Sequence, residues 1–378
     1  MKVISEGLTF TIHRDDIKTY DALPPDFYEV RFGPMTGYSL LKVPPMTITE
    51  KVYGSHNQKI RKSLDLFKRS QRNTGIILSG DKGIGKSFFA KNLSIQCVKE
   101  GYPVIIVNQS TPSLVDFLNS IEQEVVILFD EFDKTFSIRN KDNIPTTQEE
   151  MLSMLDGMST GKKLFVVTCN NLYDLSEFIV NRPGRFHYHF RFNCPETTAV
   201  EEYLTDQISP EFHGEIPAIV GFTQKVRLSY DCLRAIVTEV NMGIPFKEAI
   251  TDLNIMNTEN PVYDIYLFFE DGACLIRKDT NLELFGESPE SFTMPNKKGQ
   301  TICSVCFNPS EVTHSPNVKG SIVPAKALNI NWREPLKKED YDEEYANAVN
   351  SELDSYKSKT PAYLQIVLSK VSSMHYTL

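Results

Sequence analysis

The sequence predicts an α/β fold built on a parallel sheet, followed by a helical segment and a β-rich C-terminal part. Short apolar runs alternate with helix-like segments between residues 75 and 192, a pattern typical of a parallel sheet covered by helices on both faces. Residues 196–255 contain helical patterns only. After residue 260, strand-like runs return with turn residues between them, which indicates a β-rich region.

The α/β part contains five expected strands and four expected helices. The strands are expected at residues 75–79, 103–107, 124–130, 163–168 and 187–192, and the helices at 86–99, 112–121, 147–156 and 173–180. A further amphipathic helix is expected over 56–72, because Ile60, Leu64 and Phe67 recur at helical spacing among basic residues. Three more helices are then expected at 196–208, 229–241 and 245–253.

The C-terminal part begins with a predicted β-hairpin. Asp271-Gly272 separates strand-like residues 262–270 from 273–278, and this dipeptide is typical of a type I′ turn. Further strands are expected within 300–307 and 320–332, and an acidic helix over 337–357. The patterns therefore predict four regions: an N-terminal arm or small domain (1–50), an α/β core (51–195), a helical region (196–255) and a β-rich domain with a helical tail (256–378).

Composition and charge narrow the class of protein. The 378 residues carry a net charge of −9. This charge argues against a protein that binds along long stretches of nucleic acid, but it does not exclude a local basic channel. Seven scattered cysteines indicate reduced thiols in a cytosol-like compartment. No apolar run has the length of a membrane span, and the N-terminus lacks a secretory pattern. We therefore expect a cytoplasmic protein with no membrane partner.

A glycine-rich segment predicts a phosphate-binding loop. It runs Gly80-Asp81-Lys82-Gly83-Ile84-Gly85-Lys86-Ser87, matches G-x-x-x-x-G-K-[ST], and lies between an expected strand and a helix that continues with Phe88. The glycines allow a tight turn whose N–H groups face phosphate oxygens, and the helix N-terminus adds partial positive charge. We expect residues 80–88 to bind ATP, with Lys86 at the β- and γ-phosphates and Ser87 as a Mg²⁺ ligand.

A second motif follows further along the chain. The apolar run of residues 125–129 ends in Asp130 and Glu131, which fits a buried strand that delivers two carboxylates to the phosphate end of the sheet. We expect Asp130 to hold Mg²⁺ and Glu131 to act as the general base that polarises the attacking water. Such a pair alone more often caps a helix or faces solvent, but after a phosphate-binding loop it indicates nucleotide hydrolysis.

Four further segments complete a resemblance to a known family. They are Thr168-Cys169-Asn170-Asn171, Met151-Leu152-Ser153-Met154-Leu155-Asp156-Gly157, Asn181-Arg182-Pro183-Gly184-Arg185-Phe186, and the helical region 196–255. With the two motifs above, residues 50–255 resemble the AAA branch of the AAA+ P-loop ATPases. The compact core with unusual flanks is similar to AAA ATPases encoded by large tailed bacteriophages.

The resemblance implies roles for particular residues. Asn170 would lie near the γ-phosphate and orient the attacking water. Arg182 and Arg185 would be arginine fingers that face the nucleotide of a neighbouring subunit, and a planar guanidinium suits a transferring phosphoryl group. Residues 196–255 would form the lid. The chain would assemble as a homo-oligomer, a hexameric ring with active sites between subunits.

The sequence also departs from the family pattern. Residues 108–120 contain no aromatic-apolar-glycine pore loop, which puts polypeptide threading in doubt. Ser229-Tyr230-Asp231 replaces the usual entry to the last lid helix, with Ser229 as a candidate N-cap. Arg234 in that helix is either a sensor-2 residue or part of a solvated face.

We expect an ATP hydrolase that uses ATP and Mg²⁺ to remodel a protein or nucleoprotein partner. If the chain is phage-encoded, it would act in the host cytoplasm. A DNA-handling ATPase, such as a clamp-loader-like or replication accessory factor, is one alternative, so nucleic acid is a possible partner. A nucleotide-gated assembly protein with negligible turnover is another. Cys303 and Cys306, with His314 nearby, are either core residues or the start of a zinc site that lacks a clear fourth ligand.

Overall fold

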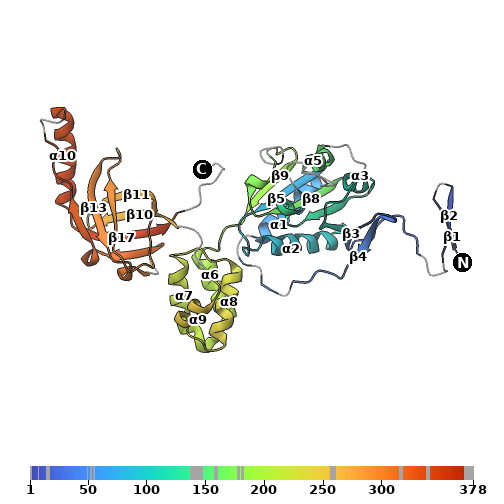
Figure 1. Ribbon diagram of the computed structural model, residues 1–378, viewed down its shortest axis with the longest axis horizontal. Helices are drawn as coiled ribbons and strands as arrows, with labels where there is room; N and C mark the ends of the chain where they lie inside the picture. The colour runs from blue at the N-terminus through green and yellow to red at the C-terminus, as the bar shows by residue number, and fades with distance from the viewer. Residues whose placement is uncertain are drawn as a thin grey trace. The chain divides into compact units, whose positions relative to one another are not determined.

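The computed structural model divides the chain into two compact units, residues 1–193 and 194–378 (Figure 1). It describes residues 2–6, 8–13, 18–48, 50, 51, 53, 56–136, 148–156, 161–176, 179, 183–255, 261–314, 318–337 and 341–369. Each unit has its own apolar core, so each is described by itself.

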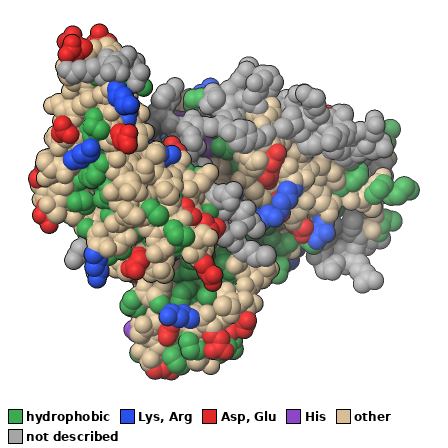
Figure 2. Space-filling model, turned by 60° about the vertical axis from the view of Figure 1, so that its left-hand side comes forward, with side chains coloured by type: hydrophobic (Ala, Val, Ile, Leu, Met, Phe, Trp, Pro, Cys, Tyr) green, Lys and Arg blue, Asp and Glu red, His purple; other side chains and the backbone are tan. Residues whose placement is uncertain are grey.

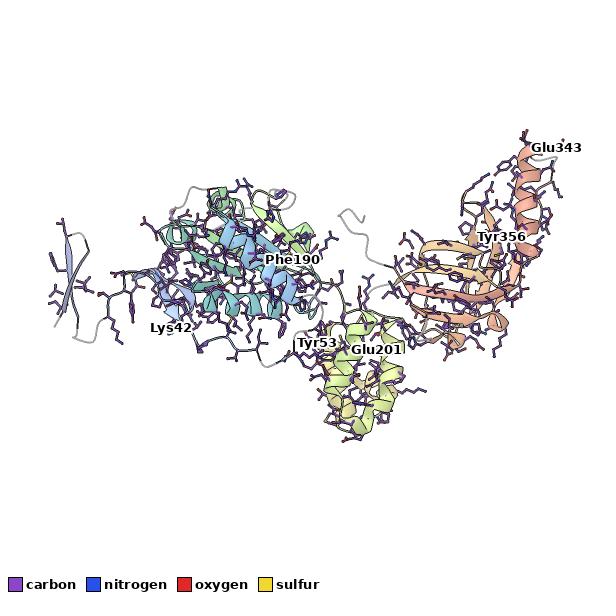
Figure 3. The ribbon with its side chains drawn as sticks, turned by 180° about the vertical axis from the view of Figure 1, so that it is seen from behind. Lys42, Tyr53, Phe190, Glu201, Glu343 and Tyr356 are labelled. Carbon is purple, nitrogen blue, oxygen red and sulfur yellow. The ribbon has the colours of Figure 1, made fainter. Side chains whose placement is uncertain are left out.

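The first unit is built on a seven-stranded sheet of order β4-β3-β6-β7-β8-β5-β9. The five predicted strands form within about two residues of their expected bounds and run parallel to one another. They are β5 (Thr74–Ser79), β6 (Val104–Val107), β7 (Val125–Phe129), β8 (Lys163–Cys169) and β9 (Phe186–Arg191). Figure 3 labels Lys42 and Phe190, which lie on the two edge strands. The predicted parallel α/β fold is therefore confirmed.

Helices cover the sheet much as predicted. They are α1 (His56–Arg69), α2 (Lys86–Lys99), α3 (Leu114–Asn119), α4 (Phe132–Thr135) and α5 (Gln148–Asp156). α1 packs against α2, and α3 packs against α5. α4 is one turn that sequence periodicity does not predict. The helix expected over 173–180 is wrong for its described residues, since the chain there forms only the 3-10 turn η1 (Leu172–Asp174).

The core of the first unit is formed by strand side chains that point to the same face of the sheet as α3 and α5. Ile77, Ile127 and Phe129 point into one cluster with Leu118 of α3 and Met151 of α5. Strand side chains alternate between the two faces of a sheet, and the buried runs without polar breaks match a sheet covered on both sides. The packed central sheet thus sets the positions of the strand ends that carry the predicted motifs.

The prediction of a separate N-terminal arm over 1–50 is wrong for residues 27–42. The strands β3 (Phe27–Gly33) and β4 (Gly37–Lys42) belong to the central sheet, because β3 pairs in parallel with β6. Leu23 is also tied to the core, since its N–H donates to Gln123 Oε1 at 2.7 Å and its C=O accepts from Gln123 Nε2 at 2.9 Å. Among the described strands of residues 1–50, the hairpin of β1 (Lys2–Glu6) and β2 (Thr9–His13) forms a separate two-stranded sheet.

The second unit begins with helices. They are α6 (Thr197–Gln207), α7 (Ile216–Thr223), α8 (Tyr230–Asn241) and α9 (Phe246–Asp252), with a 3-10 segment, η2 (Pro210–Glu215), leading into α7. Three of these helices were expected and α7 was not. Ser229 is the N-cap of α8, because its Oγ accepts a hydrogen bond from Cys232 N at 3.3 Å. Arg234 is 56% exposed and lies 3.8 Å from Asp231 Oδ1, which fits the solvated-face interpretation.

Two antiparallel sheets follow in the same unit, of order β11-β10-β17-β15-β14 and β12-β13-β16. Their strands are β10 (Val262–Phe269), β11 (Cys274–Asn281), β12 (Glu290–Pro295), β13 (Thr301–Phe307), β14 (Thr313–His314), β15 (Ser321–Pro324), β16 (Asn329–Trp332) and β17 (Pro361–Leu368). Short 3-10 turns, η3 (Pro309–Glu311) and η4 (Ala325–Ala327), connect some of them. Both sheets share one core, so the predicted β-rich region is confirmed.

The turn between β10 and β11 differs from the predicted type I′ turn. Only Gly272 has positive φ, at 83°, whereas a type I′ turn needs positive φ at both central residues. Gly272 N donates to Phe269 O at 3.0 Å, and Phe269 N donates to Ala273 O at 3.0 Å. This pattern is a longer loop that ends in a left-handed glycine.

The acidic helix of the β-rich part is α10 (Glu343–Lys357), shorter than the predicted 337–357. Asp342 is its N-cap and accepts a hydrogen bond from Tyr345 N at 3.1 Å. Glu343 and Glu344 place acidic side chains in its first turn. Figure 2 shows acidic side chains (red) gathered at one tip of the space-filling view. Leu353 is buried in the shared core, and Figure 3 shows Glu343 and Tyr356 near the two ends of α10.

Cys303 and Cys306 do not converge on a metal site. Both lie on β13, where residues three apart point to opposite faces. Cys303 is fully buried in the apolar core, and burial raises its pKa to about 12. His314 instead bonds through Nδ1 to Gln224 Oε1 at 2.9 Å. Among the described residues, no group of three or more potential ligands could hold a metal ion.

Candidate nucleotide site

The glycine-rich loop has the backbone that phosphate binding requires. Gly80, Gly83 and Gly85 have φ values of 141°, 74° and 93°, which residues with a Cβ atom rarely adopt. A Cβ at Gly80 would also lie 2.1 Å from Phe192 O, so backbone packing excludes a larger residue there. The loop begins where β5 ends and leads directly into α2, so its N–H groups and a helix N-terminus face the same side.

Lys86 is held inside this loop. Only 7% of the residue is exposed, and burial lowers its pKa. Its Nζ donates to Gly80 O and to Asp81 O, both at 2.6 Å, and to Asn170 Oδ1 at 3.0 Å. The last bond joins the loop to the residue that follows β8. The structure therefore brings Lys86 and Asn170 together.

Asp130 lies at the end of β7, beside the loop. Its Oδ1 accepts from Ser87 Oγ at 3.1 Å and from Thr168 Oγ1 at 2.6 Å. A carboxylate and a hydroxyl side by side are hard oxygen donors of the kind that Mg²⁺ takes, with phosphate oxygens and water as its other ligands. Ser87 and Asp130 therefore fit the predicted magnesium site.

Glu131 follows immediately, with the left-handed values φ 50° and ψ 49°, and leads into the short helix α4. A non-glycine residue in this conformation is uncommon and is found at functional sites. The side chain is 50% exposed and forms an ion pair with Lys134. Lys134 is the main cause of a lowered pKa at Glu131, with smaller effects from Lys82 and from a hydrogen bond with Asn170.

Two residues that sequence analysis did not single out hold these groups in place. Thr168 Oγ1 accepts a hydrogen bond from Glu131 N at 2.8 Å and donates one to Asp130 Oδ1. Thr168 therefore helps to position the Asp130 side chain and the Glu131 backbone. Asp133 Oδ2 accepts from Asn170 N at 2.9 Å. Asp133 Oδ1 is buried and has no hydrogen-bond partner among the described residues. Thr168 ends a predicted strand and Asp133 lies two residues after Glu131, which are the only sequence features that point to them.

The other predicted loop residues occupy different environments. Asp81, Lys82 and Ser87 are exposed, whereas Ile84 is 1% exposed and packs in the core. Phe88 is half-buried in the first turn of α2. Ile84 and Phe88 therefore anchor the loop, whereas Asp81, Lys82 and Ser87 are exposed to solvent.

Arg185 lies near the start of β5, at the opposite end of this strand from the phosphate-binding loop. Its C=O accepts from Gly75 N at 2.8 Å, at the start of β5, whereas the loop begins at Gly80, just past the end of that strand. Five strand residues span about 17 Å, which is beyond the reach of an arginine side chain. The structure thus does not bring Arg185 to the loop of its own chain. Arg182 lies outside the described residues.

The comparisons agree with this geometry. Residues 76–194 match the family described as ATPase family associated with various cellular activities (AAA). The chain contains an AAA ATPase domain. The matched segment runs from β5 past the end of β9, so it includes Lys86, Asp130, Glu131 and Asn170.

Several curated relatives resemble part of the chain. A proteasome-associated ATPase of Acidimicrobium ferrooxidans is 24% identical over 179 residues, which cover 39% of this chain and 31% of the relative. An AAA ATPase forming ring-shaped complexes, from Kocuria rhizophila, is 27% identical over 170 residues, or 36% of this chain and 29% of the relative. The ATP-dependent zinc metalloprotease FtsH of Mycoplasma genitalium is 26% identical over 145 residues, or 34% and 21%. The matched part of the chain spans about a fifth to a third of the length of these relatives.

Proposed function

We propose that this chain hydrolyses ATP to ADP and phosphate in a ring of identical subunits, and that the cycle remodels a protein or nucleoprotein partner. The observation that carries the proposal is the meeting of Lys86, Asp130 and Asn170 at one edge of the sheet. The distances are 3.0 Å from Lys86 Nζ to Asn170 Oδ1 and 3.1 Å from Ser87 Oγ to Asp130 Oδ1. Phosphoryl transfer depends mainly on positioning and charge stabilisation, which these groups supply.

Each side chain has one task in the proposed reaction. Lys86 and the N–H groups of residues 80–87 bind the phosphates. Ser87 and Asp130 would hold Mg²⁺, which neutralises charge on the β- and γ-phosphate oxygens. Glu131 accepts a proton from a water molecule that Asn170 orients, as the oxygen of that water attacks the γ-phosphorus. The bond from that phosphorus to the oxygen of the β-phosphate then breaks, and ADP leaves.

The position of Arg185 supports a shared active site. Its backbone lies about 17 Å from the loop of its own chain, so its side chain cannot reach a nucleotide bound to that loop. A neighbouring copy of the chain is the source we propose, with Arg182 as a second finger. The Kocuria rhizophila relative is described as forming ring-shaped complexes, which supports a ring. Six subunits, a cytoplasmic location and kinship with phage-encoded ATPases stay predictions.

Two variants separate nucleotide binding from turnover. Lys86→Ala removes the buried ammonium and should weaken ATP binding. Glu131→Gln keeps the shape of the side chain without its basicity, so ATP should bind with wild-type affinity while turnover falls by about 100-fold or more. Equilibrium ATP binding and phosphate release measure the two quantities. Wild-type turnover in Glu131→Gln would contradict the assignment of the general base.

Measurements on wild-type protein test the two alternatives, and the Glu131→Gln variant identifies the partner. Turnover of wild-type protein that is stimulated by DNA, with a steep dependence on salt, would favour a DNA-handling ATPase. Negligible wild-type turnover, with assembly that still responds to ATP, would favour a nucleotide-gated assembly protein. Partners captured by Glu131→Gln in its ATP-bound state would identify what the ring remodels.

A further inference from the structure

A cavity of about 190 Å³ lies at the edge of the central sheet where β5 begins, away from the phosphate-binding loop. Three arginines line it: Arg69 from the last turn of α1, Arg72 from the turn after that helix, and Arg185 from just before β9. No carboxylate is among its described lining residues. A guanidinium donates paired hydrogen bonds to phosphate or carboxylate oxygens, so this cavity has the chemistry of an oxyanion site.

The position of Arg72 is fixed by local bonds. Arg72 N donates to Ser70 Oγ at 3.3 Å, and Ser70 Oγ donates to Arg72 O at 2.8 Å. The Arg72 guanidinium reaches the segment that carries Arg185, because Nη2 lies 4.0 Å from where a Cβ on Gly184 would be. Arginines from two distant parts of the sequence therefore meet at one cavity.

Two simpler roles do not account for Arg69 and Arg72. Basic residues often complement the C-terminal end of a helix, but Lys162 Nζ already donates to the carbonyls there, to Lys68 O at 3.5 Å and Ser70 O at 3.3 Å. Surface ion pairing is the other common role. Neither arginine has an acidic partner among the described residues, whereas the adjacent Lys68 lies 2.7 Å from Glu100 Oε2.

We propose that Arg69 and Arg72 join Arg185 in binding the phosphates of the nucleotide held by a neighbouring subunit. This inference rests on the proposed function, because it assigns Arg185 to the active site of the neighbour. The nucleotide of the same chain is held at the far end of β5, about 17 Å away. Three guanidiniums supply positive charge and paired donors for the oxygens of a triphosphate, and the net charge of −9 argues against a broad nucleic-acid-binding surface.

Single substitutions test the inference. Arg69→Ala and Arg72→Ala are compared with Arg61→Ala, which removes another exposed arginine of α1 that does not line the cavity. ATP binding is measured at concentrations where the chain is monomeric, and turnover where it is assembled. We expect unchanged ATP affinity in all three, and turnover at least about tenfold lower in Arg69→Ala and Arg72→Ala only. Thermal unfolding confirms that each variant folds.

Mixing distinguishes action on a neighbour from action within one chain. Arg72→Ala subunits mixed with Lys86→Ala subunits should recover part of the lost turnover, because an intact loop then meets intact arginines. No recovery, or reduced ATP affinity in monomeric Arg72→Ala, would overturn the inference.

Other outcomes separate this inference from the proposed function. If wild-type turnover depends on assembly but Arg69→Ala and Arg72→Ala match Arg61→Ala, only the inference fails. If wild-type protein hydrolyses no ATP, the proposed function fails with it. If the two variants lose binding of single-stranded DNA and keep full turnover without DNA, the cavity binds nucleic acid, which also overturns the inference.

Discussion

At the scale of single residues, the charges around Glu131 affect the pH range in which this proposed general base can accept a proton. Lys134 is the largest cause of the lowered pKa of Glu131. A base is active when deprotonated, so a lowered pKa extends activity to lower pH and places the acidic limb of the kcat/KM profile below the ordinary glutamate value of 4.5.

Removing Lys134 should therefore move that acidic limb. In Lys134→Ala the pKa of Glu131 rises toward its ordinary value, and the acidic limb shifts to higher pH. Steady-state ATP hydrolysis across the acid range measures the shift. Lys99→Ala, an exposed lysine at the end of α2, is the control and should leave the profile in place. A limb that stays in place or moves to lower pH in Lys134→Ala would show that Glu131 is not the titrating base.

Asp133 illustrates how a residue can act through a neighbour's backbone. Its carboxylate accepts a hydrogen bond from Asn170 N at 2.9 Å. This bond positions the backbone of Asn170, whose side-chain Oδ1 accepts from Lys86 Nζ. Asp133→Ala should lower kcat on the order of 10- to 100-fold, because small displacements of a water-orienting group are costly. The KM for ATP should change little.

Asp133→Asn separates positioning from general damage to the fold. Asparagine keeps an oxygen that can accept from Asn170 N, so it should recover part of the lost kcat. A rise in KM with unchanged kcat in Asp133→Ala would instead place Asp133 in nucleotide binding.

At the scale of elements, the contacts between the helices and sheets of the second unit explain why they form one body. Tyr263 of β10 is fully buried, and its Oη donates to Lys225 O, just after α7, at 2.6 Å. Phe222 of α7 packs against Phe285 with ring centroids 5.4 Å apart. A rotation of the helical region would therefore carry the β-rich part with it.

Tyr263→Phe should weaken this joint. It removes the hydroxyl and leaves Lys225 O without its donor, which costs about 1–3 kcal/mol in the free energy of unfolding. Chemical denaturation followed by circular dichroism measures the loss. Tyr266→Phe, on the same strand but only half-buried, should change stability by less than about 0.5 kcal/mol. Equal effects of the two substitutions would argue against the bond.

Elements with strong local patterns were predicted from the sequence, and elements defined by distant partners were not. β3 joins the central sheet by pairing with β6, more than seventy residues away, which no local pattern reveals. β17 lies between β10 and β15 for the same reason. α7 is apolar without a clear helical period and has a proline in its first turn, so its sequence does not indicate an amphipathic helix.

The part of the candidate site that could be predicted consists of motif residues that follow the C-terminal ends of parallel strands. Lys86, Asp130 and Asn170 meet because β5, β7 and β8 run parallel and finish at one edge. Thr168 and Asp133 were not predicted, because they act by bonding backbone N–H groups whose positions only the fold defines. The cavity lined by Arg69, Arg72 and Arg185 forms where two segments distant in sequence come together, so no single sequence motif predicts it.

At the scale of the whole molecule, we propose an active site shared between subunits. The phosphate-binding loop and Arg185 lie at opposite ends of β5, so in this proposal each chain contributes to two different sites. In the described part of the chain, no helix is long and apolar enough to cross a membrane. Because the loop and Arg185 of one chain lie apart, turnover should depend on contact between chains, and an arginine finger contributes on the order of 10³-fold to the rate.

The most direct test is turnover in a mixture of two inactive variants. Arg185→Ala should bind ATP normally and hydrolyse it very slowly, whereas Lys86→Ala should fail to bind it. Mixed together, they should recover part of the wild-type rate, and wild-type specific activity should rise with protein concentration as subunits assemble. No recovery in the mixture, together with constant turnover per subunit down to concentrations where the protein is monomeric, would contradict a shared active site.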